Sequence, residues 1–437
     1  MRLKHLSALF ALSISLASCG ENEALVDALE KDNAIPQSEI RSIDEAYEIA
    51  AQSLTWFDGA DSRSSVRLLP SKNEVKVFKS KESRGESSDT LMYVVNFQDE
   101  EGFAIIPANR NLPEILAVTE SGSYDPVLDS EVEPFNEYMK NAISLMAKSP
   151  KDLNIDTLRE PFKECYTNVS ETVTKYVEPK VLFNWGQGGI NGKFCSNKFC
   201  GCSNLAVAMV CAYFEYPNTL KLSYKNDSTI VLNWANIKNH NGRSYFDLAS
   251  GYCIETIPYN DQDALGHLCR ELGKRAKTTY NKDGSGTTID NEKSAAKSLG
   301  FTVTKVYNYE NNDEYDFLSS GYVLYVRGTD ATDPENKFSH AWIVDGYKER
   351  VITTKRYIRE NDPNRVYVTE PEWELVYSGK SVSNYTHHNW GFNGLNNGWF
   401  FVGNWRTNNS VGYDDSNLVV KFDYNFYSGK KFFAIKK

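Results

Sequence analysis

Cys202 stands at the start of an apolar stretch and is a candidate nucleophile. Every residue from Leu205 to Phe214 is apolar or aromatic, which predicts a buried helix because such a helix has no face for solvent. Gly201 allows a sharp turn before it, and Pro217 cannot continue it. Free N–H groups and the helix dipole lower the pKa of a thiol in the first turn, and the thiolate is the nucleophile. An inert buried cysteine is the alternative, and only partner residues elsewhere in the chain can decide between the two.

A histidine and an asparagine follow at spacings that suit cysteine chemistry. His340 lies in a strand-like stretch, 339–346, rich in aromatic and β-branched residues, and Asn389 lies in another, 385–392. A nucleophilic cysteine needs a base within hydrogen-bond reach and a third group that orients the base. The order Cys, His, Asn, with 138 residues from Cys202 to His340, is the order of papain-like peptidases.

A second histidine, His387, is a competing candidate for the base. His387 shares a strand face with Asn389, because alternate strand residues point the same way. For His340 the alternative is a hydrogen-bonded structural histidine. The three spaced elements together favour His340 as the base.

Two groups of residues suggest a metal only weakly. His387 and His388 are adjacent, and successive strand residues face opposite sides. Cys195, Cys200 and Cys202 have poor spacing for zinc and lack a fourth ligand. We therefore expect no metal and no cofactor.

Length, charge and composition limit the class of protein. A chain of 437 residues is too long for one core, so two domains are expected. The net charge of −10 argues against a nucleic-acid partner or an acidic membrane surface. Aromatic residues at 13% and 27 glycines suit a β-rich globular protein.

The N-terminus reads as a targeting segment. Basic residues precede an apolar run at 6–16 that is too short for a membrane-spanning helix, and Leu-Ala-Ser-Cys follows. This ending looks like a bacterial lipobox, which implies a signal peptide at 1–18, lipidation of Cys19 and a polar tether at 19–23. An ordinary secretory signal with a chance cysteine is the alternative. We expect an exported lipoprotein anchored in a bacterial outer membrane or at the cell surface.

Residues 24–161 have the pattern of a small α+β unit. Ser42 and Glu45 form a capping box ahead of a helical repeat, and 133–148 also reads as a helix. Short strands are expected at 92–97, 103–106 and 113–119, the first two as a hairpin. The unit contains no catalytic constellation.

A second domain is expected at 181–437. The preceding residues 162–180 are polar and charged, which is typical of a linker open to proteolysis. Within the domain, 262–273 and 290–299 are the best helix candidates. Strands are expected at 321–327, 340–346, 351–358, 365–369, 374–378, 385–390, 398–403 and 418–436.

An ordered set of motifs resembles the streptopain-type cysteine peptidases of the papain superfamily, a bacterial family with an N-terminal prodomain. The set comprises Trp185-Gly186-Gln187, 201–217, Trp234-Ala235-Asn236-Ile237, 340–346 and Asn389-Trp390-Gly391-Phe392-Asn393-Gly394. Residues 102–108 are similar to part of the family's inhibitory prodomain. The resemblance implies an α+β papain-like fold, in which a central nucleophile helix packs on an antiparallel sheet, preceded by a small α+β prodomain.

The resemblance also implies roles for individual residues. Cys202 matches the nucleophile and His340 the general base and acid. Asn389 matches the residue that orients the imidazole, and Trp390 the ring that shields this contact from water. Gln187 and the Cys202 N–H match the oxyanion hole, which stabilises charge developing in the transition state.

Several positions depart from the family pattern. Ser339 replaces a glycine, Met209 a glutamine and Phe392 a tryptophan, and 203–205 also differ. The stretch 347–384 is longer than the family core needs and reads as an inserted hairpin. These differences bear on substrate preference more than on mechanism.

The chain has eight cysteines. With Cys19 lipidated and Cys202 free, six are left: Cys165, Cys195, Cys200, Cys211, Cys253 and Cys269. Cys195 with Cys200, and Cys253 with Cys269, are candidate disulfides in an exported protein.

Taken together, the residues and the resemblance predict a cysteine endopeptidase made as a zymogen. Its partners would be protein or peptide substrates, its own prodomain as inhibitor, and a membrane through Cys19, with no nucleic acid. Cleavage between about 149 and 180 would remove the prodomain, 24–161, and release the peptidase domain. A cell-wall cysteine peptidase or amidase and a non-catalytic binding lipoprotein are the alternatives.

Overall fold

The computed structural model describes most of the chain from residue 40 onward. It leaves out residues 1–39, 59–66, 80–89, 111, 129, 131, 149–162, 241–244, 248–251, 255–256, 283, 310–313, 330–338, 361–364, 366–368, 370, 403–405 and 410–429. The expected signal peptide, Cys19 and the tether lie outside the described residues. No helix within the described part is long and apolar enough to cross a bilayer.

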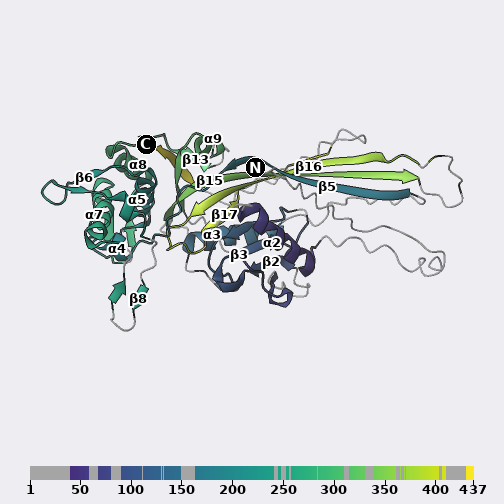
Figure 1. The fold of residues 1–437 in the computed structure, drawn as a ribbon, viewed down its shortest axis with the longest axis horizontal. Coiled ribbons are helices and arrows are strands. Elements are labelled where there is room, and N and C mark those ends of the chain that lie inside the picture. Colours follow the sequence, from purple (N-terminus) through teal and green to yellow (C-terminus); the bar gives the residue numbers. More distant parts are fainter. Residues whose placement is uncertain are drawn as a thin grey trace, which may run out of the picture.

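One antiparallel sheet runs through both halves of the molecule (Figure 1). Its N-terminal strands are β1 (Lys76–Lys79), β2 (Thr90–Asn96), β3 (Phe103–Pro107) and β4 (Ala117–Thr119). β4 pairs with β17 (Gly398–Phe401), and the order continues through β16 (Glu374–Asn389), β15 (Ser339–Glu360), β14 (Val323–Thr329), β19 (Lys431–Lys436) and β12 (Thr302–Val303). β13 (Tyr307–Asn308) also pairs with β19. The N-terminal unit therefore extends the sheet of the C-terminal domain.

The N-terminal unit has the expected elements. α2 (Ile43–Asp58) begins at the predicted capping box, in which the Ser42 N–H donates to Glu45 Oε2 at 2.8 Å and the Glu45 N–H donates to Ser42 Oγ at 3.2 Å. β2 and β3 pair as the predicted hairpin, and α3 (Glu133–Lys148) has the predicted bounds. The stretch 113–119 is a strand only at 117–119. The described residues of the unit also form two short 3₁₀ helices, η2 (Lys72–Glu74) and η3 (Gln98–Glu100).

A helical lobe surrounds α5 (Cys202–Phe214) at one end of the molecule (Figure 1). α5 packs against α7 (Tyr259–Arg275), α8 (Ile289–Ser298), β14 and β15. The two predicted helices, 262–273 and 290–299, are thus confirmed as α7 and α8. The short helices are α4 (Gly189–Gly192), α6 (Trp234–Ile237) and α9 (Glu314–Ser319), and the short hairpins are β6–β7 (219–222 and 228–231), β8–β9 (245–247 and 252–254) and β10–β11 (279–281 and 284–286).

The sheet lies between two hydrophobic cores. Alternate residues of β14 point to opposite sides, so Leu324 and Val326 belong to the core shared with α2 and α3, while Val323 and Tyr325 belong to the core around α5. The predicted α+β class, with a nucleophile helix packed on an antiparallel sheet, is confirmed. The N-terminal unit covers one face of the sheet, and the lobe around α5 covers the other.

A long three-stranded ribbon projects from the body (Figure 1). β15 pairs with β16 as far as Ile358↔Glu374, so the predicted hairpin at 347–384 is confirmed, but the separate strands expected at 340–346 and 351–358, and at 374–378 and 385–390, are each continuous. β5 (Lys163–Val177) is paired with β15 along its whole length. The expectation of an open linker at 162–180 is therefore wrong for 163–177. β18 (Arg406–Asn409) pairs with β16.

The remaining strand predictions have mixed outcomes. Residues 365 and 369 are not in a strand, and 366–368 lie outside the described residues. Of 418–436, the structure describes a strand at 431–436 only, and 418–429 are not described.

Candidate active site

The start of α5 places Cys202 as predicted. Gly201 has a φ of 87°, in the left-handed region that favours glycine, and its carbonyl accepts the Leu205 N–H at 3.0 Å. Residues 203–212 are buried all round, which agrees with the absence of a polar face in the sequence. The helix ends before Pro217, where Glu215 adopts a left-handed φ of 49°. Cys202 itself is partly exposed at the first turn.

His340 is the group that acts most strongly to lower the pKa of the Cys202 thiol. It lies at the second residue of β15, where it is opposite Gly328 of β14, and it is buried. Burial alone would raise the pKa of the Cys202 thiol, but the charge of His340 and its hydrogen bond outweigh burial, and the pKa is lowered to about 7. The Ala341 backbone and the Arg327 charge act in the same direction. The thiolate is therefore populated near neutral pH.

The main chain holds the imidazole. His340 Nε2 lies 3.0 Å from the carbonyl oxygen of Trp390. Since a carbonyl only accepts, Nε2 carries the proton, and Nδ1 is the nitrogen left for the sulfur. The rings of Trp342 and Phe392 flank the imidazole, with centroids at 6.5 and 5.2 Å.

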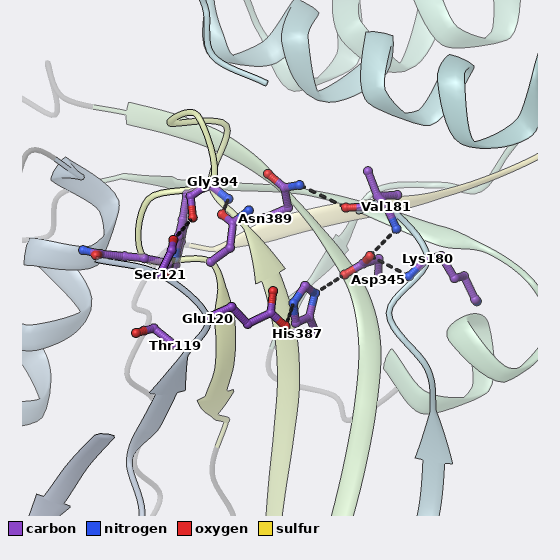
Figure 2. A network of polar contacts seen from close by, with 12 residues as sticks. Thr119, Glu120, Ser121, Lys180, Val181, Asp345, His387, Asn389 and Gly394 are labelled. Carbon is purple, nitrogen blue, oxygen red and sulfur yellow. Dashed lines mark hydrogen bonds and ion pairs between the residues drawn. The ribbon is translucent and has the colours of Figure 1, made fainter. Parts of the chain in front are cut away.

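Asn389 has a different role from the predicted one. Its Nδ2 donates to the Val181 carbonyl at 3.0 Å (Figure 2). Nδ2 also donates to the Phe183 carbonyl at 2.9 Å, and Oδ1 accepts the Gly391 N–H at 3.2 Å. Two accepting carbonyls require the amide nitrogen on that side. The prediction that the Asn389 side chain orients the imidazole is therefore wrong. Asn389 instead fixes the segment through which the chain enters the second domain.

The prediction for the Trp390 ring is wrong as well. The indole is fully buried, donates its N–H to the Asn396 carbonyl at 2.9 Å, and packs against His388 and Phe400 with centroids at 4.7 and 5.2 Å. The rings beside His340 are those of Trp342 and Phe392. Trp390 contributes its carbonyl to the imidazole.

The loop that carries Gln187 lies beside the nucleophile. The Gln187 carbonyl accepts the Cys200 N–H at 2.9 Å, two residues before Cys202, and Gly186 forms an antiparallel bridge with Phe392. The Gln187 side chain is half-buried. Its role in an oxyanion hole stays a prediction.

Comparison with known proteins assigns the family. Residues 178–400 match the family model described as the peptidase C10 family. The chain belongs to this family. It is a cysteine-type peptidase, and the resemblance to streptopain-type enzymes is confirmed. Residues 38–143 match the model described as Spi protease inhibitor, and no curated protein matches the chain.

Two solved structures are similar to this C10 peptidase. A fragment of Prevotella intermedia prointerpain A is 18% identical with a TM-score of 0.45, and the match covers 83% of this chain and 98% of the other. Active interpain A from the same organism is 16% identical with a TM-score of 0.38, and covers 60% of this chain and 95% of the other.

The rival base of this C10 peptidase, His387, is engaged elsewhere. Its Nδ1 lies 2.7 Å from Asp345 Oδ1 and its Nε2 lies 3.2 Å from Glu120 Oε1 (Figure 2). Neither ring nitrogen is left for the thiol. The neighbouring His388 contacts Thr386 Oγ1 at 2.8 Å, so the two histidines face opposite sides as expected.

The sequence reasoning missed Arg327 and Trp342. Arg327 donates to Ser339 Oγ at 2.8 Å and to the Thr287 carbonyl, which ties the residue before His340 to the start of α8. A lone arginine in an otherwise apolar strand was the available signal. Trp342 is two residues after His340, and alternate residues of a strand share a face.

The predicted disulfides are not formed. Cys195, Cys200 and Cys269 are free thiols, as are Cys202 and Cys211. Burial raises the pKa of the Cys195 thiol to about 11, and Cys200 has Cys269 as a hydrogen-bond neighbour. The side chains of Cys165 and Cys253 lie outside the described residues.

Proposed function

We propose that this protein is an exported cysteine endopeptidase, made as a zymogen, that cleaves peptide bonds through a covalent acyl-enzyme. The observation that carries the proposal is the pairing of Cys202, at the first turn of α5, with His340, whose charge lowers the pKa of the thiol to about 7. A thiolate beside an imidazolium is the activated form of a cysteine nucleophile.

The reaction follows from the positions of these groups. The Cys202 sulfur attacks the carbonyl carbon of the scissile bond, and His340 gives its proton to the leaving amine. Water then attacks the thioester while His340 takes a proton from it, which releases the acid product and restores the pair. Gln187 and the Cys202 N–H would bind the oxyanion of each tetrahedral intermediate.

The N-terminal unit would act as the intramolecular inhibitor. It shares a sheet with the peptidase domain through β4 and β17, and Tyr138 packs on Phe400 with centroids at 5.2 Å. Export through residues 1–18 and a lipid anchor on Cys19 complete the proposal. Cleavage after the prodomain would turn an anchored zymogen into a diffusible enzyme.

A direct test uses covalent labelling and casein cleavage. Activated wild-type protein should cleave casein and bind an epoxide-type thiol-protease inhibitor in a one-to-one ratio, and Cys202→Ala should do neither while keeping the same melting temperature within a few degrees. Undiminished casein cleavage by Cys202→Ala would rule out this mechanism. Absence of labelling in the activated wild type would favour the non-catalytic binding lipoprotein.

A further inference from the structure

His387 forms a buried polar contact between the two halves of the chain. The side chain is 2% exposed, yet both ring nitrogens face carboxylates: Asp345 of β15 at 2.7 Å and Glu120, just after β4, at 3.2 Å (Figure 2). Asp345 and His387 lie within the peptidase match at 178–400. Glu120 lies within the inhibitor match at 38–143. The imidazole therefore joins the peptidase domain to the prodomain.

Two ionised carboxylates on one ring favour a charged imidazole. A neutral ring has one N–H and can donate to one carboxylate only, whereas an imidazolium donates to both. Burial opposes this charge, but Asp345 and Glu120 outweigh it, and the pKa of His387 is raised to about 10. The Glu120 side chain is half-exposed; partial desolvation of its carboxyl is outweighed by the charge of His387 and its hydrogen bond, which lower the pKa of Glu120 with help from Arg67. Other neighbours of His387 include Gly346 of β15, the Trp399 ring of β17, and His388, whose own pKa is lowered well below its usual value.

The backbone around Glu120 is fixed against the peptidase domain. The Glu120 N–H donates to the Asn397 carbonyl at 2.8 Å, and Ser121 Oγ donates to the Gly394 carbonyl at 2.5 Å. Thr119, the preceding residue, pairs with Gly398 of β17. Contacts of residues 119–121 with the peptidase domain therefore fix the backbone that carries the Glu120 carboxylate to His387.

Asp345 connects this contact to the entry of the peptidase domain. One oxygen of Asp345 receives His387, and the other accepts the N–H groups of Lys180 and Val181 at 2.8 and 2.5 Å (Figure 2). Asn389 holds the Val181 carbonyl from the other side. The same segment continues to the Gln187 loop beside Cys202.

We propose that Glu120 is an electrostatic latch of the prodomain, and that the His387–Asp345 pair is the receptor on the peptidase domain for its carboxylate. The proposal rests on the zymogen function proposed above. Aromatic contacts such as Tyr138 on Phe400 hold the prodomain without regard to charge. The latch adds a contact that needs an anion at position 120 and a cation at position 387.

Prodomain retention tests the latch in the full-length chain. With Cys202→Ala to prevent self-cleavage, the chain is cut by trypsin, and dissociation of the prodomain is followed by size-exclusion chromatography. Because the Glu120 side chain is 47% exposed, Glu120→Gln should speed dissociation by only about 5- to 10-fold, below the full value of a charged hydrogen bond. Glu120→Lys should speed it further, since two cations would then meet.

Asp125→Asn is the matched control. Asp125 pairs with Lys76 inside the N-terminal unit at 2.6 Å, so this variant removes a prodomain charge that does not touch the peptidase domain. The rate at which the prodomain dissociates should stay within about twofold of that of the parent, because this surface ion pair lies within the prodomain. Glu120 variants that dissociate no faster than Asp125→Asn would overturn the latch.

A second measurement determines the protonation state of His387 directly. Nitrogen-15 NMR of the uncut Cys202→Ala chain should show His387 doubly protonated at pH 8, and Glu120→Gln should lower its titration midpoint, whereas Asp125→Asn should not. An unchanged midpoint in Glu120→Gln would also contradict the latch. Neither readout needs catalysis, so full peptidase activity of the uncut wild-type chain would end the zymogen proposal without deciding the latch.

Discussion

The imidazole of His340 donates from Nε2 to the main-chain carbonyl of Trp390, at 3.0 Å. A backbone carbonyl therefore orients the imidazole, a role that the motif spacing had predicted for the Asn389 side chain. No side-chain substitution removes a carbonyl, so the orientation of the base depends on the path of the chain at the end of β16. The Asn389 side chain and the buried Trp390 indole stabilise this path of the chain and do not contact the imidazole.

This arrangement predicts the behaviour of Asn389→Ala. The substitution leaves the buried carbonyl of Val181 and the part-buried carbonyl of Phe183 without their donor, and each unsatisfied buried group costs about 1–3 kcal/mol. We expect a lower melting temperature, with an unchanged acid limb in the pH profile of kcat/KM because the His340 hydrogen bond remains. A shifted acid limb with unchanged stability would show that Asn389 acts on the imidazole after all.

The two buried histidines should respond differently to removal. His340→Ala deletes the base and should lower kcat/KM by at least about 10³-fold, as removal of a triad member does. His387→Gln keeps the Cys202–His340 pair and should cost far less activity per folded molecule, although it loses stability because Asp345 is left buried without its cation. The rates are divided by the concentration of folded protein, measured by circular dichroism, because His340→Ala lacks the activated thiol that an active-site titrant needs. The reverse order of losses would identify His387 as the base.

The reactivity of Cys202 should depend on pH around neutrality. Its pKa is lowered from 9.0 to about 7, so alkylation of the activated enzyme by iodoacetamide should rise as pH passes upward through about 7. The same shift contributes stability that is present above the ordinary thiol pKa and is lost as pH falls through about 7. In His340→Ala, the imidazolium no longer offsets the burial of the Cys202 thiol, so the midpoint of the alkylation profile should move well above pH 7. A midpoint that stays near 7 in this variant would remove His340 as the cause.

Sequence patterns predicted the helices whose burial or capping is recorded in local residue types. The stretch 205–214 has no polar face, so it had to be a buried helix, and the capping box at Ser42 and Glu45 fixed the start of α2. The Cys202–His340 pair was predicted from the chain order and spacing of the Cys202, His340 and Asn389 motifs. The order of Cys, His and Asn cannot predict which atom of residues 389 and 390 contacts the His340 imidazole. A position in a strand predicts the face to which a side chain points, but not the group with which it bonds.

The hairpin of β15 and β16 was predicted, but the third strand of the ribbon, β5, could not be, for a related reason. Strand β5 is polar and exposed on most of its described side chains, a composition that is typical of linkers. Its hydrogen bonds come from β15, whose residues lie far along the chain, as in Val169↔Thr354. Long-range pairing of solvated strands leaves no hydrophobic period to detect.

The pairing of β5 leads to the last prediction, which concerns activation. Lys163 to Val177 are hydrogen-bonded to β15, from Glu360↔Lys163 to Tyr347↔Val177, and proteases cut segments that can leave their hydrogen bonds. We therefore expect the activating cut to fall on the N-terminal side of Lys163, so that β5 stays with the peptidase domain. The product would be at least about 31 kDa, in proportion to its 275 of 437 residues and the 49.5 kDa of the whole chain. N-terminal sequencing and mass spectrometry of wild-type protein after incubation alone should show this product, while Cys202→Ala should stay at full length unless another protease is added. A mature N-terminus within 164–177 would mean that β5 leaves the ribbon before cleavage, and the prodomain would then control the ribbon as well as the active site.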